Sequence, residues 1–247
     1  MRVGLIGYGR AGSAVTQVLE REPDLDLRWI ARRGSDRFPP QTATPILATR
    51  DRSFESILDE MPVDALIDFS GPDGVFQYGE AVRRRGVSVV SAISAYEPGA
   101  LDYLRELGQS CRVLSSPNIT LGINFLMLAA RMLRSIAPFA DVEIVEEHFR
   151  EKPEVSGTAR KLAQQLNVSD HQVTSLRIGG IVGHHEVIFG FPHQTVRIVH
   201  DSIDRQAFGT GAAFALRELA KLPAGFYSYD ELMMRLVRQQ LGALSTA

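Results

Sequence analysis

The stretch RVGLIGYGRAG, residues 2–12, decides the fold of this chain. It places a GxGxxG motif after a short apolar run and before an amphipathic pattern, which is the context that the motif requires. The first glycine permits a tight turn, the second lets a pyrophosphate approach the backbone, and the third lets the next helix pack on the strand. A helix start there also offers N–H groups and a positive dipole end to phosphates. We therefore expect a dinucleotide to contact Gly7, Gly9, Arg10, Ala11 and Gly12.

Periodicity outside the motif predicts an α/β protein with two domains. Up to about residue 117, strands alternate with helices, which favours a Rossmann-like, doubly wound parallel sheet. The strands are expected at 2–6, 25–31, 65–69, 87–90 and 112–115. The rhythm then changes to a long apolar helix at 122–136 and a mixed α+β pattern with strands at 141–148, 175–181, 185–191 and 194–202. This change of rhythm predicts a domain boundary near residue 117.

Composition excludes several classes of protein. Lys and Arg total 27 against 29 Asp and Glu, so the basic excess that nonspecific nucleic-acid binding needs is absent. One cysteine cannot form an internal disulfide. No apolar run approaches the roughly 18 residues of a membrane span, and the first residues do not resemble a signal peptide. His184 and His185 are adjacent and should face opposite sides of a strand, so no metal is expected. A cytoplasmic enzyme is the resulting expectation.

The end of the second predicted strand indicates which dinucleotide binds. An NAD site usually carries an acid about 20 residues after the glycines, where it holds the ribose 2′-hydroxyl. This chain carries Arg32 and Arg33 there instead. Arginines attract a 2′-phosphate and can bind it in a forked geometry. We therefore predict NADPH, with NADH possible; the alternative is that the two arginines form a solvated turn.

The segment EEHFREKPEVSGTA, residues 146–159, carries the chemistry. His148 is a proton donor suited to neutral pH, and Lys152 supplies a cation four residues later. The following Ser-Gly-Thr has the character of a helix N-terminus, so the three features together suit a small acidic substrate. Glu146 shares a strand face with His148 and is placed to orient it. The alternatives are a core histidine and an ordinary surface lysine.

Together these residues resemble the 4-hydroxy-tetrahydrodipicolinate (dihydrodipicolinate) reductases. The resemblance runs in order along most of the chain. Its motifs are the N-terminal GYGRAG, IDFSGP at 67–72, PNITLGIN at 117–124, the His148 segment with Ser-Gly-Thr at 156–158, RIGGIVGHHEV at 177–187 and GFYSYD at 225–230.

The resemblance implies roles for the site residues. His148 would be the general acid and Lys152 a partner that binds or polarises the substrate. Further contacts to an acidic substrate would come from Phe149, Ser156, Gly157 and Thr158. The nicotinamide side of the cofactor would be flanked by Phe69, Ser70, Ser91, Ala92 and Ser94, with Asn118 at the domain junction. The family also implies a dinucleotide-binding domain at 1–117 with 224–247, to which the final helix returns. It implies a substrate-binding and oligomerisation domain at 118–223, whose sheet builds a homotetramer.

Three departures from the family pattern bear on the substrate. Phe149 stands where the family has a second histidine, and the 152–156 segment is one residue shorter. The nicotinamide loop, usually Gly-Thr-Thr-Gly, is Ser-Ala-Ile-Ser at 91–94. Each lost polar contact to a charged group is worth about 1.5–3 kcal/mol. A dicarboxylic cyclic imine, another imine of a secondary metabolite and an unsaturated acid therefore stay open, as does a non-catalytic NADP-binding protein.

Overall fold

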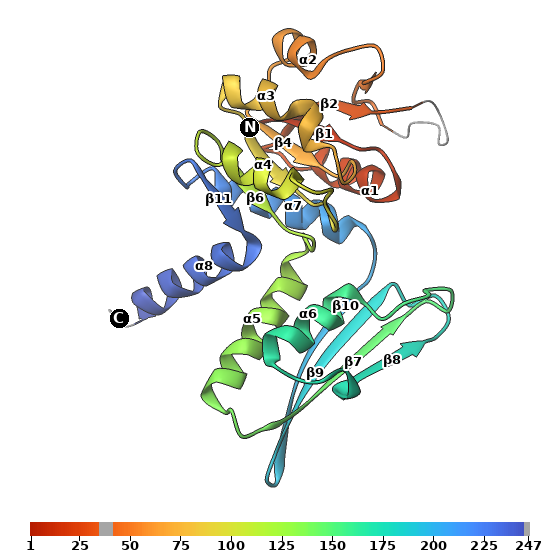
Figure 1. Ribbon diagram of the computed structural model, residues 1–247, viewed down its shortest axis with the longest axis vertical. Coiled ribbons are helices and arrows are strands. Elements are labelled where there is room, and N and C mark those ends of the chain that lie inside the picture. Colours follow the sequence, from red (N-terminus) through yellow and green to blue (C-terminus); the bar gives the residue numbers. More distant parts are fainter. Residues whose placement is uncertain (35–41, 245–247) are drawn as a thin grey trace. The chain divides into compact units, whose positions relative to one another are not determined.

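The computed structural model describes residues 1–34 and 42–244, and the chain forms two compact units (Figure 1). Unit 1 comprises Met1–Thr120 with Arg205–Ala247, and unit 2 comprises Leu121–Asp204. This division places helix α7 (Gln206–Leu219) in unit 1, whereas the sequence-based division placed it in the second domain. The physical reason is packing, because α7 lies against α1 (Arg10–Leu19) and strands of the unit 1 sheet.

Unit 1 is built on a parallel seven-stranded sheet, as the alternating pattern predicts. Its order is β11-β6-β5-β4-β1-β2-β3. The chain runs outward from β1 to β3 and then returns to build β4, β5 and β6 on the other side of β1. Ligands of such sheets bind outside the carboxyl ends of the strands at this reversal. The strands are β1 (Arg2–Ile6), β2 (Asp26–Arg32), β3 (Ile46–Ala48), β4 (Ala65–Asp68), β5 (Ser88–Ser91), β6 (Arg112–Ser115) and β11 (Gly225–Ser228).

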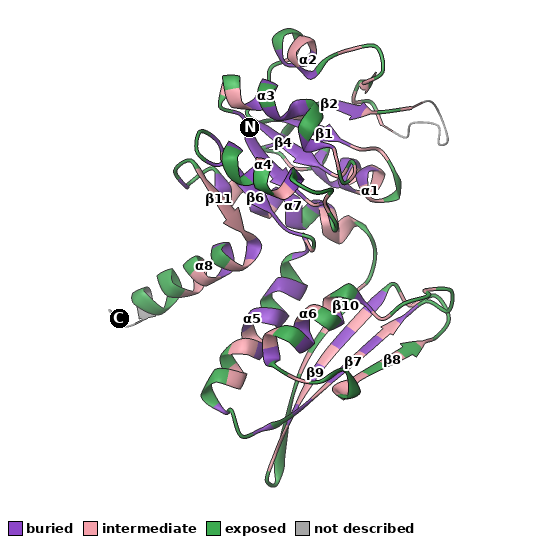
Figure 2. Cartoon of the chain, viewed as in Figure 1, coloured by how far each residue is buried: buried purple, intermediate pink, exposed green. Residues whose placement is uncertain are grey.

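Helices cover both faces of this sheet, so its central strands are buried throughout (Figure 2). One layer holds α1 and α7. The other holds α2 (Phe54–Glu60), α3 (Val75–Arg85) and α4 (Ala100–Leu107). Beneath this second layer the Phe54 ring is tilted against Trp29, with centroids 6.4 Å apart, and meets Tyr78 in a T-shaped contact, with centroids 6.0 Å apart. The last helix, α8 (Tyr229–Leu244), follows β11. None of the described helices is long and apolar enough to cross a membrane.

Unit 2 is a four-stranded mixed sheet in the order β10-β9-β7-β8. Only β7 and β8 run parallel; the other neighbours are antiparallel. Two helices, α5 (Leu121–Ile136) and α6 (Gly157–Leu166), cover one face (Figure 1). The strands are β7 (Asp141–His148), β8 (Val173–Arg177), β9 (Gly183–Phe191) and β10 (Gln194–Ser202), with a 3₁₀ turn at Asp170–Gln172 before β8.

The helix-covered face of this sheet changes from apolar to polar side chains along the strands. On β7 the inward side chains are Val142 and Ile144, which belong to the apolar core, and then Glu146 and His148. Every second residue of β7 is buried, and Figure 2 shows the same alternation. On β9 the inward position opposite Glu146 is His185, beyond the apolar part of the strand. One end of the face is therefore a hydrophobic core, and the other collects buried polar groups.

The strands predicted from the sequence are present, but one differs in length and two further strands were not predicted. The strand expected at 175–181 is β8, which ends at Arg177 because a turn with Gly179 at φ +51° follows it. The short edge strands β3 and β11 were not predicted. Three or four residues are too few to show alternation, and β11 follows a Pro-Ala-Gly sequence that indicates a turn.

Candidate functional site

Two of the motif glycines are required by close backbone contacts. Gly7 has φ +97°, and a Cβ there would lie 2.4 Å from the carbonyl oxygen of Phe69. A Cβ on Gly12 would lie 2.0 Å from the carbonyl oxygen of Gly7, so α1 can approach the turn only with glycine at this position. Gly9 differs, because no atom lies within 4 Å of the place a Cβ would take. The backbone at Gly9 is therefore open to a ligand, which is the property that a pyrophosphate contact needs.

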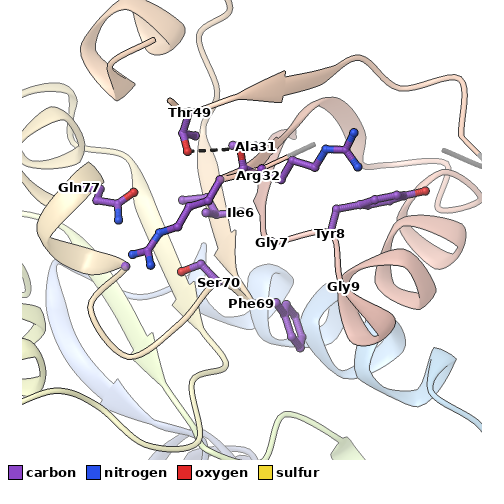
Figure 3. Close-up of a pocket in the computed structure, with 13 residues that line it drawn as sticks. Ile6, Gly7, Tyr8, Gly9, Ala31, Arg32, Thr49, Phe69, Ser70 and Gln77 are labelled. Carbon is purple, nitrogen blue, oxygen red and sulfur yellow. Dashed lines mark hydrogen bonds between the residues drawn. The ribbon is translucent and has the colours of Figure 1, made fainter. Parts of the chain in front are cut away.

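A hollow of about 450 Å³ lies beside this turn in unit 1 (Figure 3). Six of the predicted cofactor residues line it: Gly7, Gly9, Arg32, Arg33, Phe69 and Ser70. Tyr8, Thr49 and Gln77 also line it and were not predicted. The other predicted cofactor residues lie outside this lining: Arg10, Ala11, Gly12, Ser91, Ala92, Ser94 and Asn118.

The end of β2 gives the hollow a basic wall. The carbonyl of Arg32 accepts hydrogen bonds from the Thr49 N–H at 2.9 Å and the Thr49 hydroxyl at 3.3 Å, which fixes the strand end (Figure 3). The Arg33 guanidinium pairs with Asp73 at 2.6 Å. Helix α1 has no acid in its first turn, so its N-terminus keeps its positive character. The open Gly9 backbone, the hollow and this basic wall fit a phosphorylated dinucleotide.

Two groups of hydrogen-bonded hydroxyls lie at the carboxyl ends of β4, β5 and β6. Asp68 accepts from the Ser70 hydroxyl at 2.6 Å and the Tyr78 hydroxyl at 2.8 Å. Tyr96 bridges Ser91 at 2.8 Å and Ser115 at 2.7 Å. Burial raises the pKa of Asp68, because the charged carboxylate is poorly solvated there. The predicted residue Ser91 is thus buried within a network, whereas Ser94 is exposed.

Glu146 is the centre of the polar cluster in unit 2. Its side chain is completely buried. The carboxylate accepts two hydrogen bonds from Arg177, at 2.8 and 3.1 Å, and one from the Ser175 hydroxyl at 2.8 Å. Burial alone would raise the pKa of Glu146, but the Arg177 and Ser175 hydrogen bonds outweigh it and lower the pKa to about 2. A buried, ionised carboxylate therefore lies at the end of β7.

His148 lies next to this carboxylate on the same strand face. Its Nδ1 contacts Glu146 Oε2, and its ring meets that of His185 edge to face with centroids 5.3 Å apart. Burial lowers the pKa of His148 below its ordinary value, although the Glu146 hydrogen bond acts in the opposite direction. His148 is thus an imidazole whose protonation depends on its neighbours, as a proton-transfer residue requires.

The turn after β7 brings Lys152 back beside the imidazole. The Lys152 N–H donates to the carbonyl of Phe149 at 3.1 Å and closes a β-turn. Arg177 fastens this turn through the Lys152 carbonyl at 3.0 Å and the Glu154 carbonyl at 2.7 Å. The Lys152 ammonium forms no ion pair with an acid in the described part of the chain, and its charge acts on His148. Phe149 is partly exposed at the start of the turn.

The start of α6 faces the same cluster. Ser156 precedes the helix and is buried; its N–H donates to Glu146 Oε1 at 3.1 Å, and its hydroxyl bonds His185 Nε2 at 2.9 Å. Gly157 begins the helix beside open space, since no atom lies within 4 Å of its missing Cβ. Thr158 follows, half-buried, in the first turn. A helix N-terminus open at Gly157 suits a carboxylate.

The structure therefore adds residues of β8 and β9 to the site predicted from the sequence. Arg177, Ser175 and His185 face Glu146 and His148 because they lie opposite them in the register of β8 and β9. His184 points away from them and pairs with Asp201 at 2.7 Å. Burial lowers the pKa of His185 to about 3, so it is neutral at physiological pH. The alternation of inward and outward residues along β8 and β9 could have indicated these side chains, but only if the pairing of the strands had been known.

Comparisons with known proteins agree with the motifs. The family profile described as dihydrodipicolinate reductase, N-terminus, matches residues 1–119, and the profile described as dihydrodipicolinate reductase, C-terminus, matches residues 119–233. The chain is 26% identical to a 4-hydroxy-tetrahydrodipicolinate reductase of Listeria welshimeri, over 94% of this chain and all of the relative. The same enzyme of Thermosipho africanus is 28% identical, over 94% of this chain and 98% of the relative.

Solved structures share the fold. The dihydrodipicolinate reductase of Paenisporosarcina sp. TG-14, solved with dipicolinate bound, matches with a TM-score of 0.78 and 21% identity, over 92% of this chain and 97% of that one. The DAP dehydrogenase of C. glutamicum matches with a TM-score of 0.58 and 14% identity, over 94% and 93%. Since the two profiles together span nearly all of the sequence, the chain belongs to the dihydrodipicolinate reductase family and is an NAD(P)H-dependent oxidoreductase.

Proposed function

We propose that this protein is an NADPH-dependent reductase of a small carboxylic cyclic imine or unsaturated acid, of the kind that 4-hydroxy-tetrahydrodipicolinate reductase acts on. The observation that carries the proposal is the cluster at the end of β7. There His148 bonds a buried carboxylate and lies beside the Lys152 cation and the start of α6. An acid, a cation and a helix N-terminus are what a reductase of an anionic imine needs.

The cofactor would be held by unit 1. Gly7 and Gly9 would receive the pyrophosphate, and Arg32 and Arg33 the 2′-phosphate. When bound, the reduced nicotinamide supplies a hydride, which is one proton with two electrons. The Ser91–Tyr96–Ser115 hydroxyl chain would order the carboxyl ends of β5 and β6, where parallel sheets of this type receive the rest of a dinucleotide.

The substrate would be held by unit 2. Its carboxylate would meet the helix start at Gly157 and Thr158 and the ammonium of Lys152. Reduction adds a hydride to the electrophilic carbon of the C=N or C=C bond and a proton at the other end of that bond. His148 supplies the proton and becomes neutral. The activity should therefore fall as the pH rises through the pKa of His148, which lies below the ordinary value for histidine.

The direct experiment is a panel of cyclic imino acids and unsaturated acids, assayed by the loss of absorbance of the reduced nicotinamide. Steady NADPH oxidation with one class of substrate would support the proposal. Tight NADPH binding with no turnover across the panel would contradict it and would favour a non-catalytic NADP-binding protein.

The choice of cofactor is tested by Arg32→Ala and Arg33→Ala. A charged hydrogen bond to the 2′-phosphate is worth about 1.5–3 kcal/mol, so kcat/KM for NADPH should fall by about 10- to 100-fold. The value for NADH should change by less than about threefold, because NADH has no 2′-phosphate. Arg28→Ala is the matched control, since Arg28 also lies on β2 in an ion pair, with Asp26 at 3.2 Å. A wild-type enzyme that uses NADH more efficiently would contradict the assignment.

Phe149 is expected to set the substrate range. Replacing it by histidine adds a polar group at the exposed start of the Lys152 turn, where a second carboxylate could be bound. KM for a dicarboxylic imine should fall by about tenfold, with little change for a monocarboxylic one. Phe139→His, at an exposed phenylalanine elsewhere in unit 2, is the control. If Phe149→His has the same KM as the wild type for each of the two substrates, this position does not select the substrate.

We also propose that the two units divide the work, with the cofactor in unit 1 and the substrate in unit 2. The proposed assembly is a homotetramer formed through the sheet of unit 2. The face of this sheet opposite α5 and α6 exposes apolar side chains, among them Leu176 and Val199, which support an interface there.

A further inference from the structure

We infer that Glu146 is the positioning residue of the proton donor. It holds His148 by Nδ1, so that Nε2 is the atom that delivers the proton, and it favours the protonated imidazole. This inference rests on the proposed function, because it assigns a role within the same site.

The geometry of β7 determines which nitrogen is available. Glu146 and His148 are two residues apart on one strand face, and Glu146 Oε2 contacts Nδ1. Nε2 points to the other side of the ring, towards Gly183 at the start of β9. A Cβ at Gly183 would lie 3.2 Å from Nε2, a tight contact that glycine avoids. Glu146 thus engages Nδ1, whereas no side chain among the described residues forms a hydrogen bond with Nε2.

The bonding of Glu146 excludes a direct catalytic role for its carboxylate. Oε1 accepts from the Ser156 N–H, the Ser175 hydroxyl and Arg177, at 3.1, 2.8 and 2.8 Å. Oε2 accepts from Arg177 at 3.1 Å and contacts His148. With the side chain fully buried and both oxygens engaged, a substrate cannot approach it. The carboxylate therefore holds the imidazole in place and, through its bond with Ser156, the start of α6.

The charges around His148 define the electrostatic part of the inference. Lys152 from the turn and Arg177 from β8 are cations that disfavour the imidazolium. His185 from β9 packs against the ring and is neutral at physiological pH. Among the described residues that act on His148, Glu146 is the one acid that favours the charged form. Removing its charge should therefore lower the pKa of His148 further.

The protonated ring donates its Nε2 proton to the substrate atom that receives no hydride, and the N–H bond breaks as the new bond to that atom forms. The ring becomes neutral and keeps its Nδ1 proton bonded to Glu146. A proton from solvent restores the imidazolium before the next turnover.

Glu146→Gln tests the inference in the full-length protein. A glutamine amide can donate to Nδ1, which favours the neutral ring with a proton on Nε2. The fall of kcat/KM at high pH should move about one pH unit or more to lower pH, and kcat/KM at pH 7 should fall at least tenfold. Titration of the His148 ring proton by NMR should show the same shift. Glu147→Gln, on the outward side of β7, should leave both unchanged.

A second variant tests the inference if Glu146→Gln does not fold. Glu146→Gln leaves the Arg177 charge without its buried partner, whereas Glu146→Gln with Arg177→Met removes both charges together. If the wild type turns over and a folded Glu146→Gln keeps the wild-type pH profile and His148 titration, the inference is overturned. The double variant is compared with Arg177→Met, because Arg177 itself lowers the pKa of His148. Equal His148 titration in these two proteins would also overturn the inference. A wild type that reduces no substrate would instead defeat the proposed function. The NMR shift of His148 in Glu146→Gln would still decide the coupling between the two side chains.

Discussion

Replacing His148 by glutamine is expected to lower kcat by about 10²–10⁴, with KM for the substrate changed by less than about threefold. The reason is that glutamine keeps the size and polarity of the side chain but cannot donate a proton at neutral pH. The remaining activity would come from the bound hydride donor and from Lys152, with the proton taken from water. Steady-state kinetics across pH is the measurement, and the pH dependence assigned to His148 should disappear from the profile of the variant.

His184→Gln is the matched control for this prediction. His184 lies in unit 2 on β9, next to His185, but faces the other side of the sheet and pairs with Asp201. Its kcat should stay within about twofold of the wild type. NADPH binding should be the same in all three proteins, because the hollow proposed for the dinucleotide belongs to unit 1. Unchanged turnover in His148→Gln would remove the general-acid role.

Arg177→Met is expected to destabilise the protein by about 3–5 kcal/mol at pH 7, which is the usual cost of breaking a buried ion pair. Arg177 bonds the completely buried Glu146 and also the carbonyls of Lys152 and Glu154. Methionine has a similar length but leaves the Glu146 carboxylate without a cation. Urea denaturation gives the free energy of unfolding.

The pH dependence follows from the pKa of Glu146, which the fold lowers to about 2. Because the fold lowers this pKa, the ionised carboxylate stabilises the folded state at pH values above the ordinary pKa of glutamate. This stabilisation is lost as the pH falls towards about 2. The difference between the wild type and Arg177→Met should therefore shrink between about pH 4.5 and pH 2. Arg197→Met is the control, because Arg197 pairs with Glu186 at 2.7 Å but is exposed. Its cost should be about 0–1 kcal/mol, and an equal cost for both variants would contradict the account.

The unit 1 fold could be predicted because its signals are local. GYGRAG fixes the first turn and helix within six residues, and the two close contacts of Gly7 and Gly12 show why. Short apolar stretches at β4, β5 and β6, with no alternation of polar residues, then indicate buried parallel strands. The edge strands β3 and β11 could not be predicted in this way, since they are short and depend on pairing with β2 and β6.

The unit 2 site could be predicted only in part. His148, Lys152 and the start of α6 lie within one segment, so their spacing indicates a common site. The β8 partners of Glu146, Ser175 and Arg177, lie about 30 residues further along the chain and meet it through strand register. His185 of β9 reaches the same cluster through its register with β7. Arg177 in particular gave no local signal of a buried role, since it ends a strand and precedes a glycine turn.

The central claim is that this chain reduces an acidic imine or unsaturated acid at the His148 site. The most direct measurement is mass spectrometry of the product formed from NADPH deuterated at the transferred position, with the substrate that the panel identifies. We predict one deuterium on carbon in the product of the wild type and of His184→Gln, and a rate lowered by about 10²–10⁴ in His148→Gln. A product without deuterium, or an equal rate in His148→Gln, would contradict the account.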